Sequence, residues 1–222
     1  MRGFVTALTL SLTLALGAVA SQAGAQGRPR AEAGGPGPSQ GELIYKAAIA
    51  ASHTDPAKWD WPSAASERVR KEIVEGQYSP EELRNIFTTL ARSSGPHWPN
   101  SGPQAGNPSM GEITAPDFVM HGRGFAGLEA FYGSNGYGGV SDRVNKVDTL
   151  LAHGDSIFIS WIIEGHHTGK LFGFPGDGKL LDVRESSMTR FKDGKAVEMH
   201  DVGDDLALYT QAGGKISFPD KP

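Results

Sequence analysis

Three stretches in the second half of the chain alternate between apolar and polar positions with a period of two, the pattern of half-buried β-strands. They cover residues 143–151, 156–170 and 179–191, and a shorter fourth stretch covers residues 196–202. A Lys-Asp-Gly-Lys turn at 192–195 separates the last two, and an Asp-Gly pair between alternating runs is a strong hairpin signal. We therefore expect antiparallel strands over this half of the chain.

The preceding part of the chain has the spacing of amphipathic helices instead. Residues 41–53, 64–75 and 79–92 place apolar side chains at intervals of three and four. The last of these begins with Ser-Pro-Glu-Glu at 79–82, which combines an N-cap serine, a first-position proline and acids in the first turn. Residues 93–109 are rich in Gly, Pro, Ser and Asn and predict a loop. The order of elements indicates an α+β protein.

The first residues of the chain have the pattern of a secretory signal peptide. Arg2 precedes an apolar run from Phe4 to Ala20, and small-x-small cleavage motifs end at Ala20 and Ala25. An uncleaved membrane anchor is the alternative, but the run barely reaches the roughly 20 residues that span a bilayer, and the cleavage motifs favour secretion. We expect a secreted or periplasmic protein that does not contact the membrane after processing. The expected organisation is signal peptide 1–25, flexible linker 26–40, helical extension and loop 41–109, and main domain 110–215.

Composition removes several classes of function. The 222 residues include 21 Lys and Arg against 25 Asp and Glu, a net charge of −4, so no basic stripe suits a nucleic-acid backbone. The chain has no Cys, which excludes disulfides, thiolate metal sites and a cysteine nucleophile.

Alternation also predicts which polar side chains point inward. In each of three strands the mostly apolar face carries at least one polar or charged residue. Burying such a group without a partner costs roughly 1–3 kcal/mol, so polar groups inside a curved sheet favour a pocket. The alternative is that a strand end faces water, above all at Asp201, because aspartate is rarely fully buried. The inner-face residues of interest are Trp161, His167, Glu185, Ser187, Met199 and Asp201.

Several motifs now suggest a family. They include Ala-Pro-Asp-Phe-Val-Met-His at 115–121, Gly-His-His-Thr-Gly-Lys-Leu-Phe-Gly-Phe-Pro at 165–175 and Arg-Phe-Lys-Asp-Gly-Lys at 190–195. With these motifs, residues 116–214 resemble the SnoaL-like polyketide (ester) cyclases of the NTF2-like superfamily. The resemblance implies a cone-shaped α+β half-barrel, in which a curved mixed β-sheet packs on helices around a deep apolar pocket. It also implies a homodimer, and it leaves the helical segment before the domain as an N-terminal extension.

The resemblance further implies a chemistry. Cyclases of this family close a ring by an intramolecular aldol reaction, without a metal or an organic cofactor. Asp201 matches the acid–base residue on the last long strand, and Ser187 stands where a donor steadies the enolate. His121 lies in the segment where the related ketosteroid isomerases carry their base, and His167 fills the histidine position of the Gly-His-x-Thr-Gly motif. The predicted catalytic residues are Asp201, His121 and His167, and the predicted substrate-binding residues are Trp161, Glu185, Ser187 and Met199.

Three readings of function follow from these residues. The first is an exported cyclase or isomerase that acts on a small apolar, polyketide- or steroid-like carbonyl compound. The second is an exported protein that binds such a compound in the same pocket without chemistry. The third is a metal site at His121, His167 and His200, which we disfavour because His200 is out of phase with Asp201 on its strand. We expect neither a metal nor a cofactor.

Overall fold

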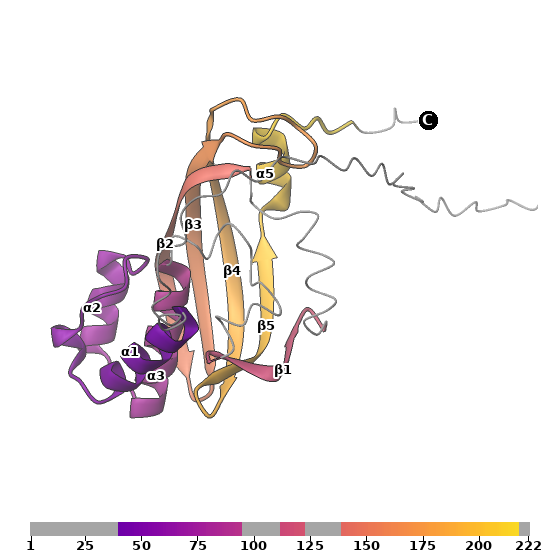
Figure 1. Cartoon of the computed structure of the whole chain (residues 1–222). Helices are drawn as coiled ribbons and strands as arrows, with labels where there is room; N and C mark the ends of the chain where they lie inside the picture. Colours follow the sequence, from indigo (N-terminus) through magenta and orange to yellow (C-terminus); the bar gives the residue numbers. More distant parts are fainter. Residues whose placement is uncertain (1–39, 95–111, 123–138, 218–222) are drawn as a thin grey trace, which may run out of the picture. The chain divides into compact units, whose positions relative to one another are not determined.

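The computed structural model describes residues 40–94, 112–122 and 139–217. Its strands form one curved, open sheet in the order β1-β5-β4-β3-β2 (Figure 1). β1 runs parallel to β5, and the other neighbouring pairs are antiparallel, so the sheet is mixed. The expected α+β fold with a curved mixed sheet packed on helices is confirmed. The strands are β1 (Thr114–Met120), β2 (Val140–His153), β3 (Ser156–His167), β4 (Leu180–Lys192) and β5 (Lys195–Gly203).

The three helices predicted before the sheet are present, with small shifts at their ends. Figure 1 shows them together beside one end of the sheet, while a further short helix lies at the other end. That further helix, α5, was not predicted, and Asp204 caps it by accepting a hydrogen bond from Ala207 N. The helices are α1 (Gln40–Ser52), the 3₁₀ turn η1 (Pro56–Lys58), α2 (Glu67–Glu75), α3 (Pro80–Ser94) and α5 (Asp205–Gln211).

The start of α3 is held by a capping box, as its sequence predicts. Ser79 N donates to Glu82 Oε2 over 2.8 Å, and Glu82 N donates to Ser79 Oγ over 3.2 Å. The other oxygen of Glu82 accepts a hydrogen bond from Gly154 N at 3.0 Å, in the turn between β2 and β3. The first turn of α3 is therefore tied directly to the sheet.

The predicted faces of the central strands are confirmed. On β3, Ile157, Ile159 and Ile163 are buried while Phe158 and Glu164 are exposed. The buried set packs against α3 in one hydrophobic core, which includes the apolar face of that helix. Burial of this shared core is the main favourable contribution to folding.

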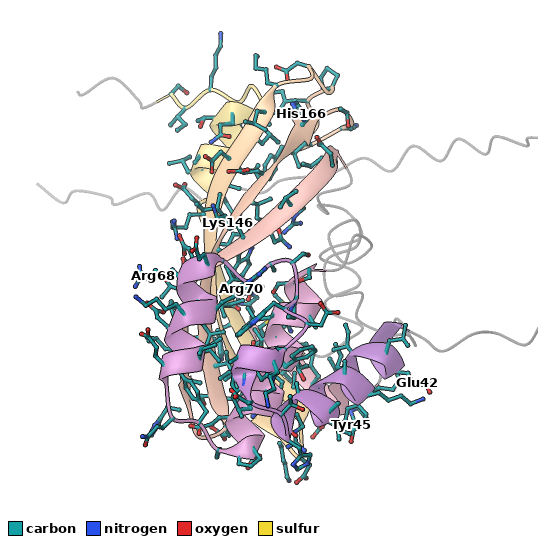
Figure 2. The ribbon with its side chains drawn as sticks, turned by 90° about the vertical axis from the view of Figure 1, so that its left-hand side faces the viewer. Glu42, Tyr45, Arg68, Arg70, Lys146 and His166 are labelled. Carbon is teal, nitrogen blue, oxygen red and sulfur yellow. The ribbon has the colours of Figure 1, made fainter. Side chains whose placement is uncertain are left out.

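Several strand ends differ from the prediction, and the end of β3 has a clear physical reason. β3 ends at His167 rather than Lys170, because the next residues leave the ladder to bond elsewhere. Thr168 N and Gly169 N both donate to Gly139 O, and Leu171 and Phe174 then exchange backbone hydrogen bonds in a tight turn. Figure 2 shows His166, the neighbour of this boundary, at the end of the sheet away from α2.

α2 is fastened to the edge of the sheet as well. Ser66 N donates to Val147 O over 3.1 Å and Val147 N donates to Ala64 O over 2.7 Å, which joins the start of the helix to β2. Figure 2 shows Arg68 and Arg70 of α2 near Lys146 of β2.

Some predictions concern residues that lie outside the described part of the chain. They are the signal peptide at 1–25, nearly all of the linker at 26–40 and most of the loop at 93–109. Among the described residues, none of the helices has the length and apolar character needed to span a bilayer.

Candidate functional site

Most of the predicted site residues meet on the inner face of the sheet. Ser187 of β4 pairs directly with Asp201 of β5. Met199 lies two residues before Asp201 on β5 and on the same face of the sheet. Glu185 lies two residues before Ser187 on β4, also on this face, and pairs with Trp161 of β3. Same-face neighbours along a strand are about 7 Å apart and paired side chains about 5 Å apart. These five side chains therefore share one area of the sheet.

Asp201 carries a carboxyl with a perturbed pKa. Asp201 as a whole is half-buried, but its Oδ1 atom is fully buried and has no hydrogen-bond partner among the described residues. Burial raises the pKa of Asp201 to about 6, against smaller opposing effects of the Arg92 charge, the Ser187 hydroxyl and His200. A carboxyl with this pKa exists in both protonation states near neutral pH, as a group that takes and returns a proton requires.

The Ser187 hydroxyl lies close to this carboxyl without a well-formed bond to it. Ser187 is 2% exposed, and its Oγ makes no hydrogen bond of normal geometry with the described residues. The Ser187 hydroxyl therefore lowers the pKa of Asp201 through a longer polar contact across the strand pair. No other group among the described residues orients this hydroxyl, which is a suitable donor to a ligand oxygen.

Arg92 is a member of the site that the sequence did not predict. It stands in the last turn of α3, is 7% exposed, and places Nη2 3.6 Å from Met199 Sδ. Burial lowers the pKa of Arg92 to about 10, while the Asp201 carboxylate acts to raise it. Arg92 thus remains a cation at neutral pH, above the strand that carries Asp201.

Further polar atoms of the same helix are buried. Asn85 and Thr89 precede Arg92 by seven and three positions, which places all three toward one side of α3. Thr89 Oγ1 and both side-chain polar atoms of Asn85 are buried without a partner among the described residues, as is Thr189 Oγ1 on the sheet. Buried polar atoms are normally hydrogen-bonded, so this concentration favours a site that a polar ligand or water completes.

His167 is buried on the inner face, as predicted, but far from Asp201. It lies eight positions along β3 from Ile159, the residue on the Asp201 rung, which is roughly 26 Å at about 3.3 Å per residue. His167 Nδ1 is 3.4 Å from Asp177 Oδ1, and the His167 backbone bonds to Lys179 O and Gly178 N. The structure therefore places His167 where it holds the return loop to β4, and not beside the carboxyl of Asp201.

His121 also does not join Asp201. It is exposed, has a left-handed backbone conformation with φ of 51°, and follows the buried Met120 at the end of β1. Its ring centroid is 6.3 Å from that of His200, which points away from the inner face and pairs with Glu198 over 3.0 Å. The predicted second base thus lies on the outer side. Among the described residues no group of three His, Asp or Glu side chains is arranged to hold a metal.

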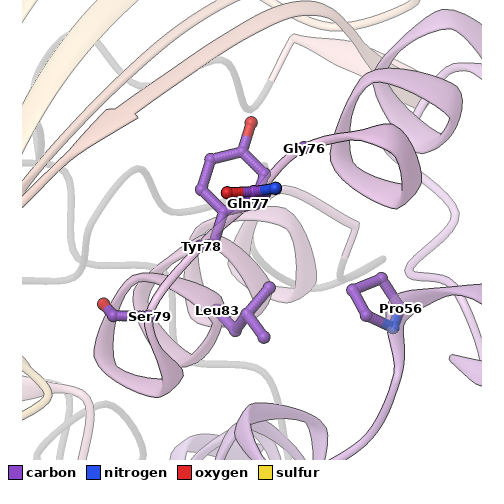
Figure 3. Close-up of a pocket in the computed structure, with 6 residues that line it drawn as sticks. All are labelled: Pro56, Gly76, Gln77, Tyr78, Ser79 and Leu83. Carbon is purple, nitrogen blue, oxygen red and sulfur yellow. The ribbon is translucent and has the colours of Figure 1, made fainter.

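A hollow of about 480 Å³ lies in the helical segment (Figure 3). None of the predicted site residues lines it, and it is open to the outside. The deep apolar pocket implied by the resemblance remains a prediction, since residues 95–111 and 123–138 lie outside the described part. The hollow is lined by Pro56, Gly76, Gln77, Tyr78, Ser79 and Leu83.

The sheet order and the inner-face carboxyl define an α+β protein with a candidate acid–base site. Residues 107–212, a little under half of the chain, match the family model described as SnoaL-like polyketide cyclase. The match includes every sheet residue of the candidate site and leaves out Arg92 and the rest of α3.

Solved structures of similar proteins come from several bacteria. A protein of Jannaschia sp. CCS1 described as a SnoaL-like polyketide cyclase is 23% identical, with 64% of this chain and 99% of that chain covered and a TM-score of 0.49. IdmH of Streptomyces antibioticus, described as a polyketide cyclase, is 23% identical, with 53% and 92% covered and a TM-score of 0.42. Both scores are low, so the fold assignment rests on the sheet and on the matched residues. No curated protein matches the chain.

Proposed function

We propose that the protein is a cofactor-independent acid–base catalyst of the ester cyclase or isomerase type, acting on a small apolar carbonyl compound. One observation supports this above all: the Asp201 carboxyl, with a pKa of about 6, on the inner face of a sheet that matches the cyclase family model. A base with a pKa near the working pH removes a proton and then returns it efficiently. Polyketide- and steroid-like ketones are the substrate class that this chemistry suits.

In the proposed reaction Asp201 does the proton transfer. Its carboxylate takes the proton from the carbon next to a substrate carbonyl, and the protonated carboxyl later returns it to the product. The buried side chains of Trp161 and Met199 supply an apolar surface beside Asp201. This surface favours the neutral form of the carboxyl and binds the hydrocarbon parts of the substrate. The Ser187 hydroxyl donates to a substrate oxygen. His121 and His167 have no part in this proton transfer because of where they lie.

Enolisation can be measured before the natural substrate is known. The protein is incubated in deuterium oxide with a panel of steroid and polyketide-derived ketones, and deuterium uptake next to the carbonyl is followed by mass spectrometry. We expect uptake by at least one ketone that depends on Asp201 and is reduced by about 100-fold or more in Asp201→Asn, in line with general base catalysis. Ketones that bind without uptake, with an affinity that Asp201→Asn alters, favour the alternative of a non-catalytic binding protein.

We also propose that the protein works as a homodimer. On the outer face of the sheet Phe158 and Met188 are paired across β3 and β4 and are 36% and 44% exposed, so an apolar contact is available there. Sedimentation of the protein and of Met188→Glu tests this. A dimer that Met188→Glu dissociates supports it, and a monomeric wild type excludes it.

The pattern of residues 1–25 leads us to propose that the protein acts outside the cytoplasm. Cell fractionation followed by N-terminal sequencing tests this proposal. A mature chain beginning after Ala20 or Ala25 in the periplasm or medium is the expected result, and a full-length chain in the cytoplasm contradicts it.

A further inference from the structure

Enolate formation on the sheet creates a negative charge that one hydroxyl stabilises only weakly. Removing a proton next to a carbonyl moves the charge onto the carbonyl oxygen, inside an environment that disfavours charge. The Ser187 hydroxyl is a neutral donor, and charge-assisted hydrogen bonds are about twice as strong as neutral ones. A stronger donor near Asp201 is therefore needed for the proposed reaction.

Arg92 lies where such a donor is required. Its Nη2 is 3.6 Å from Met199 Sδ, and Met199 is the same-face neighbour of Asp201 on β5, about 7 Å along the strand. The guanidinium is therefore above the inner face of β5, within the length of a small ligand from the carboxyl. Ser187 and Thr189, whose hydroxyls are buried without partners among the described residues, stand opposite these two β5 residues.

The helix that carries Arg92 is bonded to the sheet near both of its ends. Asn145 of β2 donates from Nδ2 to Ser93 O over 3.0 Å, one residue after Arg92. At the start of α3 the Glu82 carboxylate accepts from Gly154 N over 3.0 Å. Because both ends of α3 are bonded to the sheet, the backbone that carries Arg92 is held in place before a ligand arrives, and such preorganisation makes a charged donor effective.

We propose that Arg92 is the oxyanion-binding residue of this site, and that the substrate is a carbonyl compound whose enolate oxygen binds the guanidinium while Asp201 takes the α-proton. This inference rests on the proposed function and names a residue outside the part of the chain matched to the cyclase family. It predicts that the site prefers ligands with an anionic or readily ionised oxygen next to an apolar body.

The reaction balances with these two residues. The Asp201 carboxylate accepts the α-proton, and the electrons of the C–H bond form the new C=C bond. The electrons of the carbonyl π bond move onto oxygen, giving an enolate that Arg92 binds with its N–H donors. The enolate carbon then attacks a second carbonyl of the same molecule, forming the C–C bond. The alkoxide that results takes the proton back from Asp201, so nothing is consumed.

A purely structural Arg92–Asp201 pair is the competing explanation, and its consequences differ. A buried ion pair contributes little more to stability than an apolar replacement would. A purely structural pair would not bind an added anion. The discriminating observation is therefore an anion that binds through Arg92 and is bound less well when that charge is removed.

The test uses para-nitrophenol, whose ionised oxygen next to an aromatic ring imitates an enolate and whose absorbance distinguishes phenolate from phenol. We expect the wild type to bind the phenolate better than the phenol, so that the bound probe ionises at lower pH than the free probe. Arg92→Gln is expected to weaken phenolate binding by about 10- to 100-fold, the range of a lost charged hydrogen bond, and phenol binding much less. Arg68→Gln on α2, which removes an exposed arginine paired with Glu72, is the matched control and should bind as the wild type does.

Each outcome decides between the possibilities. Equal phenolate binding by the wild type and a folded Arg92→Gln, or no preference for phenolate in the wild type, overturns the inference. If Arg92→Gln does not fold, Arg92→Met replaces it: the apolar stem is kept and the charge is removed, and unchanged phenolate binding overturns the inference equally.

Deuterium uptake separates this inference from the proposed function. Uptake that needs Asp201 but is equal in Arg92→Gln leaves the proposed function standing and removes the role of Arg92. Phenolate binding that depends on Arg92, without uptake by any ketone, leaves an anion-binding site and removes the catalysis.

Discussion

Ser187 and Asp201 face each other directly across β4 and β5, with the hydroxyl and the carboxyl on the inner face of the sheet. The hydroxyl lowers the pKa of Asp201, although burial prevails and leaves it raised to about 6. The protonation state of Asp201 near neutral pH is therefore sensitive to small changes in the groups around its carboxyl.

Removing the Ser187 hydroxyl should raise the pKa of Asp201 above about 6, because a group that favours the carboxylate is lost. NMR titration of the Asp201 carboxyl in the wild type and Ser187→Ala measures the change. Ser186→Ala is the matched control, since Ser186 is the next residue on the opposite face of β4. A lower pKa in Ser187→Ala contradicts the prediction.

The raised pKa of Asp201 should make folding less favourable as pH increases. As pH rises, Asp201 ionises first in the unfolded chain. The contribution of its protonated carboxyl to folding stability is therefore intact below about pH 4, the unfolded pKa, and is lost by the time pH passes about 6. Two pKa units correspond to about 3 kcal/mol. Urea unfolding of the wild type and Asp201→Asn at several pH values tests this. The wild type should lose up to about 3 kcal/mol relative to Asp201→Asn between about pH 4 and pH 7, whereas a constant difference would show that the carboxyl is not buried.

The capping box of α3 should contribute to stability and to the placement of Arg92. Glu82→Gln weakens the hydrogen bonds from Ser79 and Gly154 and should lower the free energy of unfolding by about 1 kcal/mol. These bonds lower the pKa of Glu82, so its contribution is present above the unfolded pKa and disappears as pH falls through the folded value. Glu81→Gln, one residue earlier and mostly exposed, is the control. Equal unfolding midpoints for both variants contradict the prediction.

His167 should matter for folding more than for proton transfer. His167→Leu removes the contact between the end of β3 and Asp177, which lies in the return loop shortly before β4, and leaves the loop less firmly held. A loss of about 2–3 kcal/mol is typical for such a buried polar contact, and deuterium uptake by ketones should be nearly unchanged in folded protein. His166→Leu, at the neighbouring exposed position, is the control. A folded His167→Leu without uptake would establish His167 as catalytic, as the sequence predicted.

The sheet part of the site could be predicted from the sequence because it depends on local rules. Period-two alternation placed Ile159 and Ser187 inward, and the pairing of long strands then brought Asp201 opposite Ser187. The family motifs added the role of the carboxyl. Neither step requires knowledge of how separate elements pack.

The remainder depends on packing and on local backbone conformation. Arg92 reaches Met199 across 107 residues of sequence, and helical spacing alone indicates only that Arg92 shares a side of α3 with Asn85 and Thr89. That spacing was the one available signal. His121 follows the end of β1 with a left-handed backbone, so strand alternation does not determine its direction. The short helix α5 was missed because its seven residues have little periodicity to detect.

The two charged groups of the site come from different parts of the chain. Asp201 lies within residues 107–212, whereas Arg92 comes from α3, which precedes them. A fragment trimmed to the family domain would keep the carboxylate and lose the cation. Under the proposed role of Arg92, chimaeras that exchange the segment before residue 107 between homologues would change how the enolate oxygen is bound, while leaving in place the carboxylate that takes the proton. Selection for new substrates can act in the same way, because mutations in α3 change the cation without altering the sheet that carries Asp201.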